Sequence, residues 1–220
     1  MALSQDVFDF LRELKENNNR DWFEEHKQRH LNAKEQIENL IKELIDGFSE
    51  FDPHIHQDIS PKKCLFRIYR DIRFSKDKTP YKTWYSAGIS VDGRKLEGPE
   101  YYIHIEPENS YLAVGYWRPK KEHLAEIRQE IDYNGKELEK SLKQGGFSLE
   151  DLGVYDKLKR APAGYTEEHE YIEVLKVKSL ILNIEIDNRM LLSKDASQQI
   201  IKQYFRMYPF KQFIHQAIGQ

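Results

Sequence analysis

Apolar positions recur at helical spacing through the first quarter of the chain. The first series is Val7, Phe10, Leu11 and Leu14. A repeat of three or four residues places such side chains on one helix face, and we expect this helix to begin after an N-cap at Ser4 and to end at the asparagines 17–19. Asp21 resembles a second cap, and the apolar stripe behind it predicts a longer helix that stops at Gly47. The region 1–60 should therefore be helical.

From about residue 63 the apolar period changes to two. One set of alternate positions holds Phe66, Ile68, Ile72 and Phe74. Alternation puts successive side chains on opposite faces of an extended strand, so Arg70 falls on the apolar face while Arg67 and Arg73 fall on the other. Three further strands are expected at 84–91, 100–106 and 111–117. The pairs Asp92-Gly93 and Glu108-Asn109 lie between them and suit tight reversals, which favours an antiparallel meander.

After Pro119 the pattern returns to helices. We expect them at 121–131, 135–143, 167–177 and from Asp195 onward, with one apolar strand at 179–186. Pro209 should break or kink the last helix. Together these segments predict one α+β domain over 1–220: helical at 1–60, mainly β at 62–118 and mainly helical at 119–220, with a central antiparallel sheet flanked by N-terminal and C-terminal helices.

Composition supports a folded chain and limits its environment. Aromatic residues make up 12% and charged residues 32%, and disordered chains are poor in aromatics. The single cysteine, Cys64, excludes an internal disulfide and suits a reducing compartment. The first residues show no basic region followed by an apolar run, and no apolar stretch approaches the ~20 residues of a membrane span. We expect a cytoplasmic protein with no membrane partner; no cofactor or oligomeric state is indicated.

Positive charge is concentrated in one short segment of an otherwise acidic chain. The stretch 62–82 carries a net charge of +6 against −3 for the whole chain, so the remainder carries −9. Arginine binds carboxylates and phosphates in a planar, bidentate manner, and lysine adds less directional charge. The segment therefore predicts an anion site. Its candidate ligand-binding residues are Arg67, Arg70, Asp71, Arg73, Ser75, Lys76, Lys78, Tyr81 and Lys82.

Arg70 leaves two interpretations open. An unpaired buried charge costs several kcal/mol, so a guanidinium on an apolar face needs a partner. That partner is either a carboxylate of the protein, such as Asp71 or Asp77, or an oxyanion ligand. The loop 75–81 lacks the glycines of a phosphate-binding P-loop, which excludes a Walker-type nucleotide site.

Three stretches of the chain point to a family. The segment 66–82, Phe-Arg-Ile-Tyr-Arg-Asp-Ile-Arg-Phe-Ser-Lys-Asp-Lys-Thr-Pro-Tyr-Lys, resembles the signature of a widespread bacterial and fungal family of conserved domains of unknown function. The stretches 17–23 and 160–165, the latter ahead of His169, are similar to the same family. The resemblance runs over nearly the whole chain and implies a single cytoplasmic domain of this length. It implies no activity, cofactor or catalytic residue.

A second group of candidates lies on the predicted strand 100–106. Tyr102, His104 and Glu106 alternate onto one face, where His104 is a candidate general acid or base oriented by Glu106. Such a histidine more often only satisfies a polar sheet face. Tyr116 and Arg118 close the next strand and are expected to wall the same pocket, so that all of these residues share one sheet face with the motif arginines.

The remaining histidines and Cys64 give no metal site. His26 and His30 stand one helical turn apart, as two zinc ligands do, but the residues between them are two cations and a glutamine rather than the glutamate of a protease motif. We interpret them as part of a solvated helix face. Cys64 is expected to be a half-buried strand residue.

Three functions are compatible with these patterns. We favour binding, with or without turnover, of a small phosphate- or carboxylate-bearing ligand at the Arg/Lys cluster on the central sheet; whether the protein is an enzyme is open. The first alternative is nucleic-acid binding, with Tyr69, Phe74 and Tyr81 stacking between the cations, although the −9 elsewhere would repel a long polyanion. The second is a structural ion-pair network with no ligand.

Overall fold

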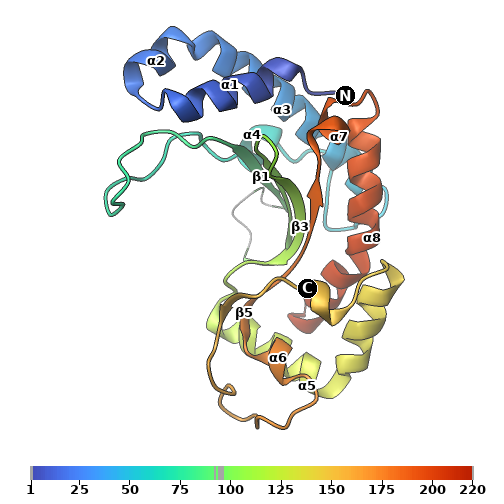
Figure 1. Cartoon of the computed structure of the whole chain (residues 1–220). Helices are drawn as coiled ribbons and strands as arrows, with labels where there is room; N and C mark the ends of the chain where they lie inside the picture. The colour runs from blue at the N-terminus through green and yellow to red at the C-terminus, as the bar shows by residue number, and fades with distance from the viewer. Residues whose placement is uncertain (1, 92, 94–96, 220) are drawn as a thin grey trace. The chain divides into compact units, whose positions relative to one another are not determined.

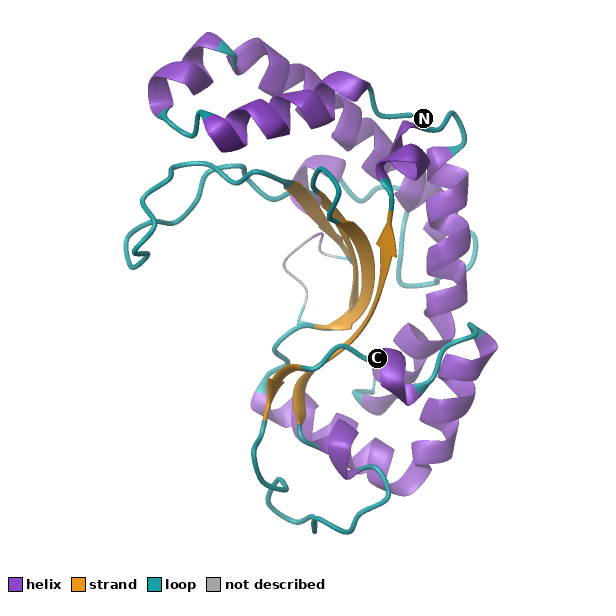
Figure 2. Cartoon of the chain, in the orientation of Figure 1, coloured by secondary structure: helices purple, strands orange, loops and turns teal. Residues whose placement is uncertain are grey.

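The computed structural model describes residues 2–91, 93 and 97–219 (Figure 1). It has an α+β fold that contains a five-stranded antiparallel sheet with the strand order β1-β2-β3-β5-β4 (Figure 2). The strands are β1 (Tyr85–Ile89), β2 (Glu100–Ile105), β3 (Ser110–Tyr116), β4 (Tyr155–Lys157) and β5 (Val177–Ile186). The predicted fold class is confirmed, including the meander that its first three strands form.

Residue contacts divide the chain into two compact units. Unit 1 comprises 1–94, 102–112 and 185–201, and unit 2 comprises 95–101, 113–184 and 202–220. The single domain expected from the sequence over 1–220 stays a prediction.

Helices α1 (Gln5–Glu16), α2 (Arg20–Glu25) and α3 (Lys27–Phe48) open unit 1. Ser4 is the N-cap of α1, as predicted, although its side chain makes no capping hydrogen bond. The second cap is Asn19 and not Asp21, because the Asn19 side chain accepts a hydrogen bond from the Trp22 N–H at 3.0 Å. The expected long helix is therefore two helices that meet at His26.

The core of unit 1 contains the apolar faces that the helical spacing predicted. Helices α1 and α3 pack against each other, and α3 contacts the short helix α4 (Pro61–Cys64), which in turn contacts β1. The buried residues of α3 are Ala33, Ile37, Leu40, Ile41, Leu44, Ile45 and Phe48. Burying a large aliphatic or aromatic side chain contributes roughly 1.5–3 kcal/mol, so this stripe holds α3 in place.

The strand expected from about residue 63 is absent. Residues 61–64 form α4, and the described chain from 65 to 84 contains only single bridging residues, Leu65 with Ala87 and Tyr69 with Tyr81 (Figure 2). Phe74 is 95% exposed although Ile68 is buried, so the alternation does not separate two faces. Cys64 accordingly lies buried at the end of a helix and not in a strand.

Unit 2 contains α5 (Lys121–Gln144), α6 (Ile172–Leu175) and the antiparallel pair β4 and β5. Two of the expected helices form the single element α5, in which Asn134 has non-helical backbone angles. Helix α6 is shorter than the expected 167–177, and β4 was not predicted. Gly115 in β3 has a φ of 142°, and a Cβ there would lie 2.1 Å from the Leu180 carbonyl oxygen, so only glycine allows this close approach of β3 to β5.

The last helices differ from the pattern in two ways. A short helix, α7 (Asn188–Leu192), follows β5 and was not predicted; the Asp187 side chain caps it by accepting from the Met190 N–H. Helix α8 (Ala196–Ala217) contains Pro209 and continues past it, so the predicted break does not occur, while the alternative of a kink stays a prediction. No helix in the described residues is both long and apolar enough to cross a bilayer.

Candidate functional site

Residues 65–84, the basic hairpin, run out from the sheet and return to it beside α1 and α2 (Figure 1). Backbone hydrogen bonds close its base: the Arg70 N–H donates to the Pro80 carbonyl at 2.9 Å and the Lys82 N–H donates to the Ile68 carbonyl at 2.8 Å. The segment is therefore an irregular two-stranded loop held by a few rungs and not an edge of the sheet.

Tyr81 anchors the basic hairpin to the helices. Its ring is 4% exposed and stacks on Phe23 of α2 with centroids 3.9 Å apart. The Asn18 side chain donates to the Tyr81 carbonyl at 3.0 Å and accepts from the Tyr81 N–H at 3.1 Å. Tyr81 is consequently a structural residue, and its ring is not available to stack on a ligand.

Arg70 binds groups of the protein itself. Its guanidinium donates to the Asp77 carboxylate, to the Thr79 hydroxyl and, at 3.1 Å, to the Thr79 carbonyl. A longer contact of 3.5 Å reaches the Ser75 hydroxyl. The Thr79 N–H and the Arg70 guanidinium both lower the pKa of Asp77. These contacts favour the structural interpretation of Arg70, which ties the two arms of the hairpin together.

The tip of the basic hairpin is exposed. Arg73 donates to Asp71 at 2.9 and 2.7 Å and lowers the pKa of that carboxyl to about 2. The Lys78 ammonium donates to the Ile72 carbonyl at 2.9 Å. Arg67 and Lys76 are exposed and make no hydrogen bond or ion pair with any residue that the structure describes. The basic hairpin therefore has exposed cations that no described residue pairs with, but fewer of them than the number of basic residues in 62–82 suggests.

His104 lies on β2 between two aromatic rings of unit 1. Its ring stacks on Tyr111 at 4.7 Å and 13° and on Trp84 at 5.5 Å and 29°. Only 7% of the residue is exposed, whereas Tyr102, Tyr111 and Trp84 are half-buried. This stack fixes the plane of the imidazole, which is what a positioned proton carrier requires.

A chain of polar contacts runs from Glu106 through His104 to Tyr102. The Glu106 carboxylate lies 3.1 Å from Nε2 of His104, and the Tyr102 hydroxyl lies 3.4 Å from its Nδ1. The Asn109 amide donates to the same Glu106 oxygen at 2.9 Å. Burial lowers the pKa of His104, Glu106 partly offsets this, and Lys82 lowers it further. A neutral His104 that donates from Nε2 to Glu106 leaves Nδ1 to accept from Tyr102.

Lys82 and Phe66 connect the basic hairpin to this sheet face. The Lys82 ammonium lies 5.6 Å from the centroid of the Phe66 ring, and Phe66 lies 6.2 Å from the ring of Tyr102. Lys82 is also among the charges that lower the pKa of His104. The structure thus brings Lys82, Tyr102, His104 and Glu106 together, by a route that does not use the predicted strand.

Tyr116 and Arg118 belong to unit 2 and have partners there. The Tyr116 hydroxyl lies 3.0 Å from Nδ1 of His123, and the Arg118 N–H donates to the Ser179 hydroxyl at 3.0 Å. The exposed Arg118 guanidinium lies over the Trp117 ring. Their expected place in a pocket with His104 stays a prediction.

Sequence reasoning did not select Trp84 and Tyr111 as site residues. A signal for Tyr111 was present, because a reversal at Glu108-Asn109 brings the residues on either side of it into cross-strand contact. Glu108 does adopt a φ of 60°, and the Asn109 N–H donates to the Glu106 carbonyl at 3.1 Å. The signal for Trp84 was weaker, because the predicted meander pairs 84–91 with 100–106 but does not fix the register that places Trp84 against His104.

The two helical histidines fill structural roles. His30 is half-buried, its Nδ1 lies 2.8 Å from the Tyr85 hydroxyl, and burial lowers its pKa to about 4. His26 stacks on Trp22 at 4.0 Å. The expected solvated face is therefore wrong for His30, because the helix turns it toward β1. Within the described residues no three His, Cys, Asp or Glu side chains are grouped as metal ligands.

Comparison with known proteins gives one match. The model of a family described as "Conserved hypothetical protein (DUF2461)" matches residues 6–213. No curated protein and no solved structure matches the chain.

Proposed function

The chain belongs to the DUF2461 family, and on that premise we propose that it binds a small carboxylate- or phosphate-bearing ligand at the His104 face. This face consists of Phe66, Lys82, Trp84, Tyr102, His104, Glu106 and Tyr111. The observation that carries the proposal is the Glu106–His104–Tyr102 chain, held between two rings with a lysine beside it. The proposal retains the cytoplasmic location that the lone cysteine suits.

Charge supports an anion at this face. Lys82 is half-buried, and a cation of this kind attracts a carboxylate or a phosphate more strongly than one surrounded by water. Exposed Arg67 follows Phe66 directly in the chain and has no ion-pair partner among the described residues. Arg67 adds positive charge to the segment that carries Phe66, and it does so without breaking the contacts of Arg70 or Arg73.

The aromatic walls restrict the body of the ligand. Trp84, Tyr102 and Tyr111 are half-buried, so each presents some ring surface to solvent. Aromatic rings favour offset-stacked or edge-to-face contact with another ring and contribute about 0.5–1.5 kcal/mol beyond burial. A flat ligand with one anionic substituent therefore suits this face better than inorganic phosphate does.

The polar chain adds the capacity to move a proton. Glu106 orients His104, and His104 in turn accepts from the Tyr102 hydroxyl, so Tyr102 is the end of the chain that a ligand can reach. In this arrangement the Tyr102 oxygen takes a proton from a bound ligand while its own proton passes to Nδ1 of His104, and the Glu106 carboxylate stabilises the imidazolium that forms. Turnover at this face would consist of such an acid–base step.

Isothermal titration with phenyl phosphate, benzoate and inorganic phosphate tests the proposal. We expect the two aromatic anions to bind and inorganic phosphate to bind more weakly. Lys82→Gln should weaken binding about tenfold or more, because a hydrogen bond to a charged group contributes about 1.5–3 kcal/mol. The matched control is Lys76→Gln, which removes the same charge from an exposed position of the hairpin.

Two outcomes contradict the proposal. One is that none of the three probes binds. The other is that Lys82→Gln and Lys76→Gln reduce the affinity equally, which would show that general positive charge attracts the probe and that the His104 face does not hold it.

A second candidate function, binding of single-stranded nucleic acid, is favoured by one observation. Phe74 is 95% exposed and Tyr69 is 49% exposed on a segment that also carries exposed Arg67 and Lys76. Single-strand binding combines cations with rings on which bases stack. Titration of a labelled oligonucleotide at rising salt tests this, and Phe74→Ala should abolish binding without lowering the melting temperature. Binding that Phe74→Ala leaves unchanged would eliminate this candidate.

A further inference from the structure

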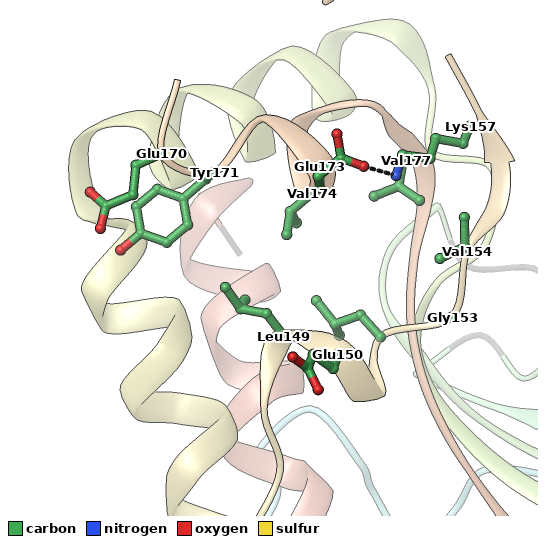
Figure 3. A pocket seen from close by; sticks show the side chains of 11 residues that line it. Leu149, Glu150, Gly153, Val154, Lys157, Glu170, Tyr171, Glu173, Val174 and Val177 are labelled. Carbon is green, nitrogen blue, oxygen red and sulfur yellow. Dashed lines mark hydrogen bonds and ion pairs between the residues drawn. The ribbon is translucent and has the colours of Figure 1, made fainter. Parts of the chain in front are cut away.

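Unit 2 contains a cavity with a volume of about 230 Å³, which Figure 3 shows from close by. Apolar side chains form most of its wall: Leu149, Leu152, Val154, Val174, Val177 and the ring of Tyr171. Leu149 and Val174 project toward each other across the open space (Figure 3). All of the residues that line the cavity belong to unit 2, whereas the residues of the His104 face belong to unit 1.

The elements around the cavity are fixed by local interactions. The turn at Leu149 is a 3₁₀ segment, Leu149–Asp151, closed by a capping box between Ser148 and Asp151. On the opposite side Val174 belongs to α6, and Val177 begins β5, which pairs with Lys157 of β4. Part of the wall is therefore built from secondary structure, whereas Val154, Glu170 and Tyr171 come from the connecting segments.

Tyr171 is locked in its position. Its hydroxyl donates to Glu139 at 3.0 Å, and a Cβ on Gly135 would lie 2.2 Å from the ring. Because Gly135 has no side chain, the Tyr171 ring can occupy the space that a Cβ there would take. Because the ring is held from two sides, it cannot swing inward to fill the cavity, and the apolar volume persists.

Two exposed carboxylates belong to residues that line the cavity. Glu150 and Glu170 are exposed, lie at the edge of the cavity and make no hydrogen bond or ion pair with any other described residue. Glu173 pairs with Lys157, as the dashed line in Figure 3 marks, so that these two charges compensate each other. The rim therefore carries two uncompensated carboxylates around an apolar interior.

We propose that this cavity binds a small organic ammonium ion, with its apolar part inside and its charged group at the acidic rim, beside Glu150 or Glu170. An apolar wall with a few polar groups that fix orientation is the usual composition of a small-molecule site. The volume is below the ~300–1,000 Å³ of drug-sized sites. At about 30 Å³ for each water-sized group, it accommodates about eight non-hydrogen atoms. The inference concerns unit 2 alone and does not rest on the function proposed for the His104 face.

Three matched probes test the proposal: hexylammonium, hexanol and hexanoate, which share a six-carbon chain and differ in charge. Binding is followed by ¹H–¹⁵N chemical-shift changes on the whole protein. We expect hexylammonium to bind best, hexanol less well and hexanoate least, with shifts centred on 149–154 and 170–177. Glu150→Gln combined with Glu170→Gln should weaken hexylammonium binding by up to about fivefold and leave hexanol unchanged, since a single exposed ion pair contributes up to ~1 kcal/mol.

A matched control separates the rim from general charge. Glu122→Gln combined with Glu126→Gln removes the same two charges from exposed positions of α5 that do not line the cavity. Val174→Phe should fill the space and abolish binding of all three probes; if that variant does not fold, Leu149→Phe serves instead, at a less buried position.

The proposal is overturned if no probe shifts the named segments. It is also overturned if the three probes bind equally, or if the α5 control weakens hexylammonium as much as the rim variant does.

Discussion

At the scale of single residues, charge pairing decides which cations of the basic hairpin are available to a ligand. Arg70 and Arg73 each have an aspartate of the same hairpin as their partner, but their surroundings differ. The Arg70 side chain is 22% exposed and bridges two arms of the hairpin, whereas the Arg73 side chain is 76% exposed and binds a carboxylate two residues away. Arg70 thus closes a loop, while the exposed pair at Arg73 adds little to stability.

This contrast predicts unequal effects of two like substitutions. Arg70→Ala should destabilise the protein by about 1–3 kcal/mol, because it removes the donor that binds the half-buried Thr79 carbonyl and one of the donors that bind Asp77. Arg73→Ala should change the stability little. Urea denaturation at pH 7 measures both, and equal losses from the two variants would contradict the structural role of Arg70.

At the scale of elements, the basic hairpin depends on a contact with the N-terminal helices. Two of the three stretches that resemble the family signature, 17–23 and 66–82, meet at this contact. The Asn18 side chain hydrogen-bonds both the N–H and the carbonyl of Tyr81, and Phe23 stacks on the Tyr81 ring. Pro80 fixes one backbone angle immediately before this anchor. The shared motifs therefore have a structural explanation, independent of any ligand.

Asn18→Ala should loosen the hairpin more than it loosens the rest of the protein. The substitution removes the side-chain amide that donates to the Tyr81 carbonyl and accepts from the Tyr81 N–H. Few other backbone hydrogen bonds hold the two arms of the basic hairpin together. Hydrogen exchange of the Arg70 and Lys82 amides should accelerate, while α3 amides keep their protection. Asn32→Ala, on the exposed face of α3, is the control. Unchanged exchange at both hairpin amides would show that Asn18 is not the anchor.

At the scale of the whole molecule, two half-buried groups link stability to pH in opposite directions. Burial lowers the pKa of His30 in unit 1 to about 4 and raises that of Glu100 in unit 2 to about 7. Between about pH 4.5 and 6.5 the folded state lacks the proton that an unfolded His30 binds, so this group makes stability rise with pH. Over the same range the folded state keeps a proton that an unfolded Glu100 loses, so that group makes stability fall as pH rises.

These opposite slopes test whether the chain unfolds as one domain. In a single cooperative transition the two contributions cancel, so His30→Asn should make stability fall with pH relative to the parent, and Glu100→Gln should make it rise, each by up to about 1.4 kcal/mol per pH unit. Calorimetry between pH 4.5 and 6.5 provides the measurement. If the units unfold separately, the parent will show two transitions that move in opposite directions with pH, and the single-domain prediction will be wrong.

How far sequence reasoning reached is visible in particular residues. The helical stripe of α3 and the strands around 85–89, 100–105 and 110–116 were predictable, because burial imposes a period of 3.6 or 2 on residues close in sequence. The same reasoning failed at 66–74. Alternation alone does not make a strand; a strand also needs a neighbour to hydrogen-bond, and this segment leaves the sheet and pairs with its own returning arm.

In the candidate site, too, the residues related by local spacing were predictable and those brought together by tertiary contacts were not. Tyr102, His104 and Glu106 were found from spacing within one strand, as was the concentration of charge at 62–82. Their neighbour Tyr111 comes from β3 and Trp84 from the end of the basic hairpin, and the partner of Arg70 is reached only by the fold of the hairpin. Local spacing and charge are properties of the chain and are legible in it. Which cation is already satisfied depends on pairwise distances, and only the folded structure sets those.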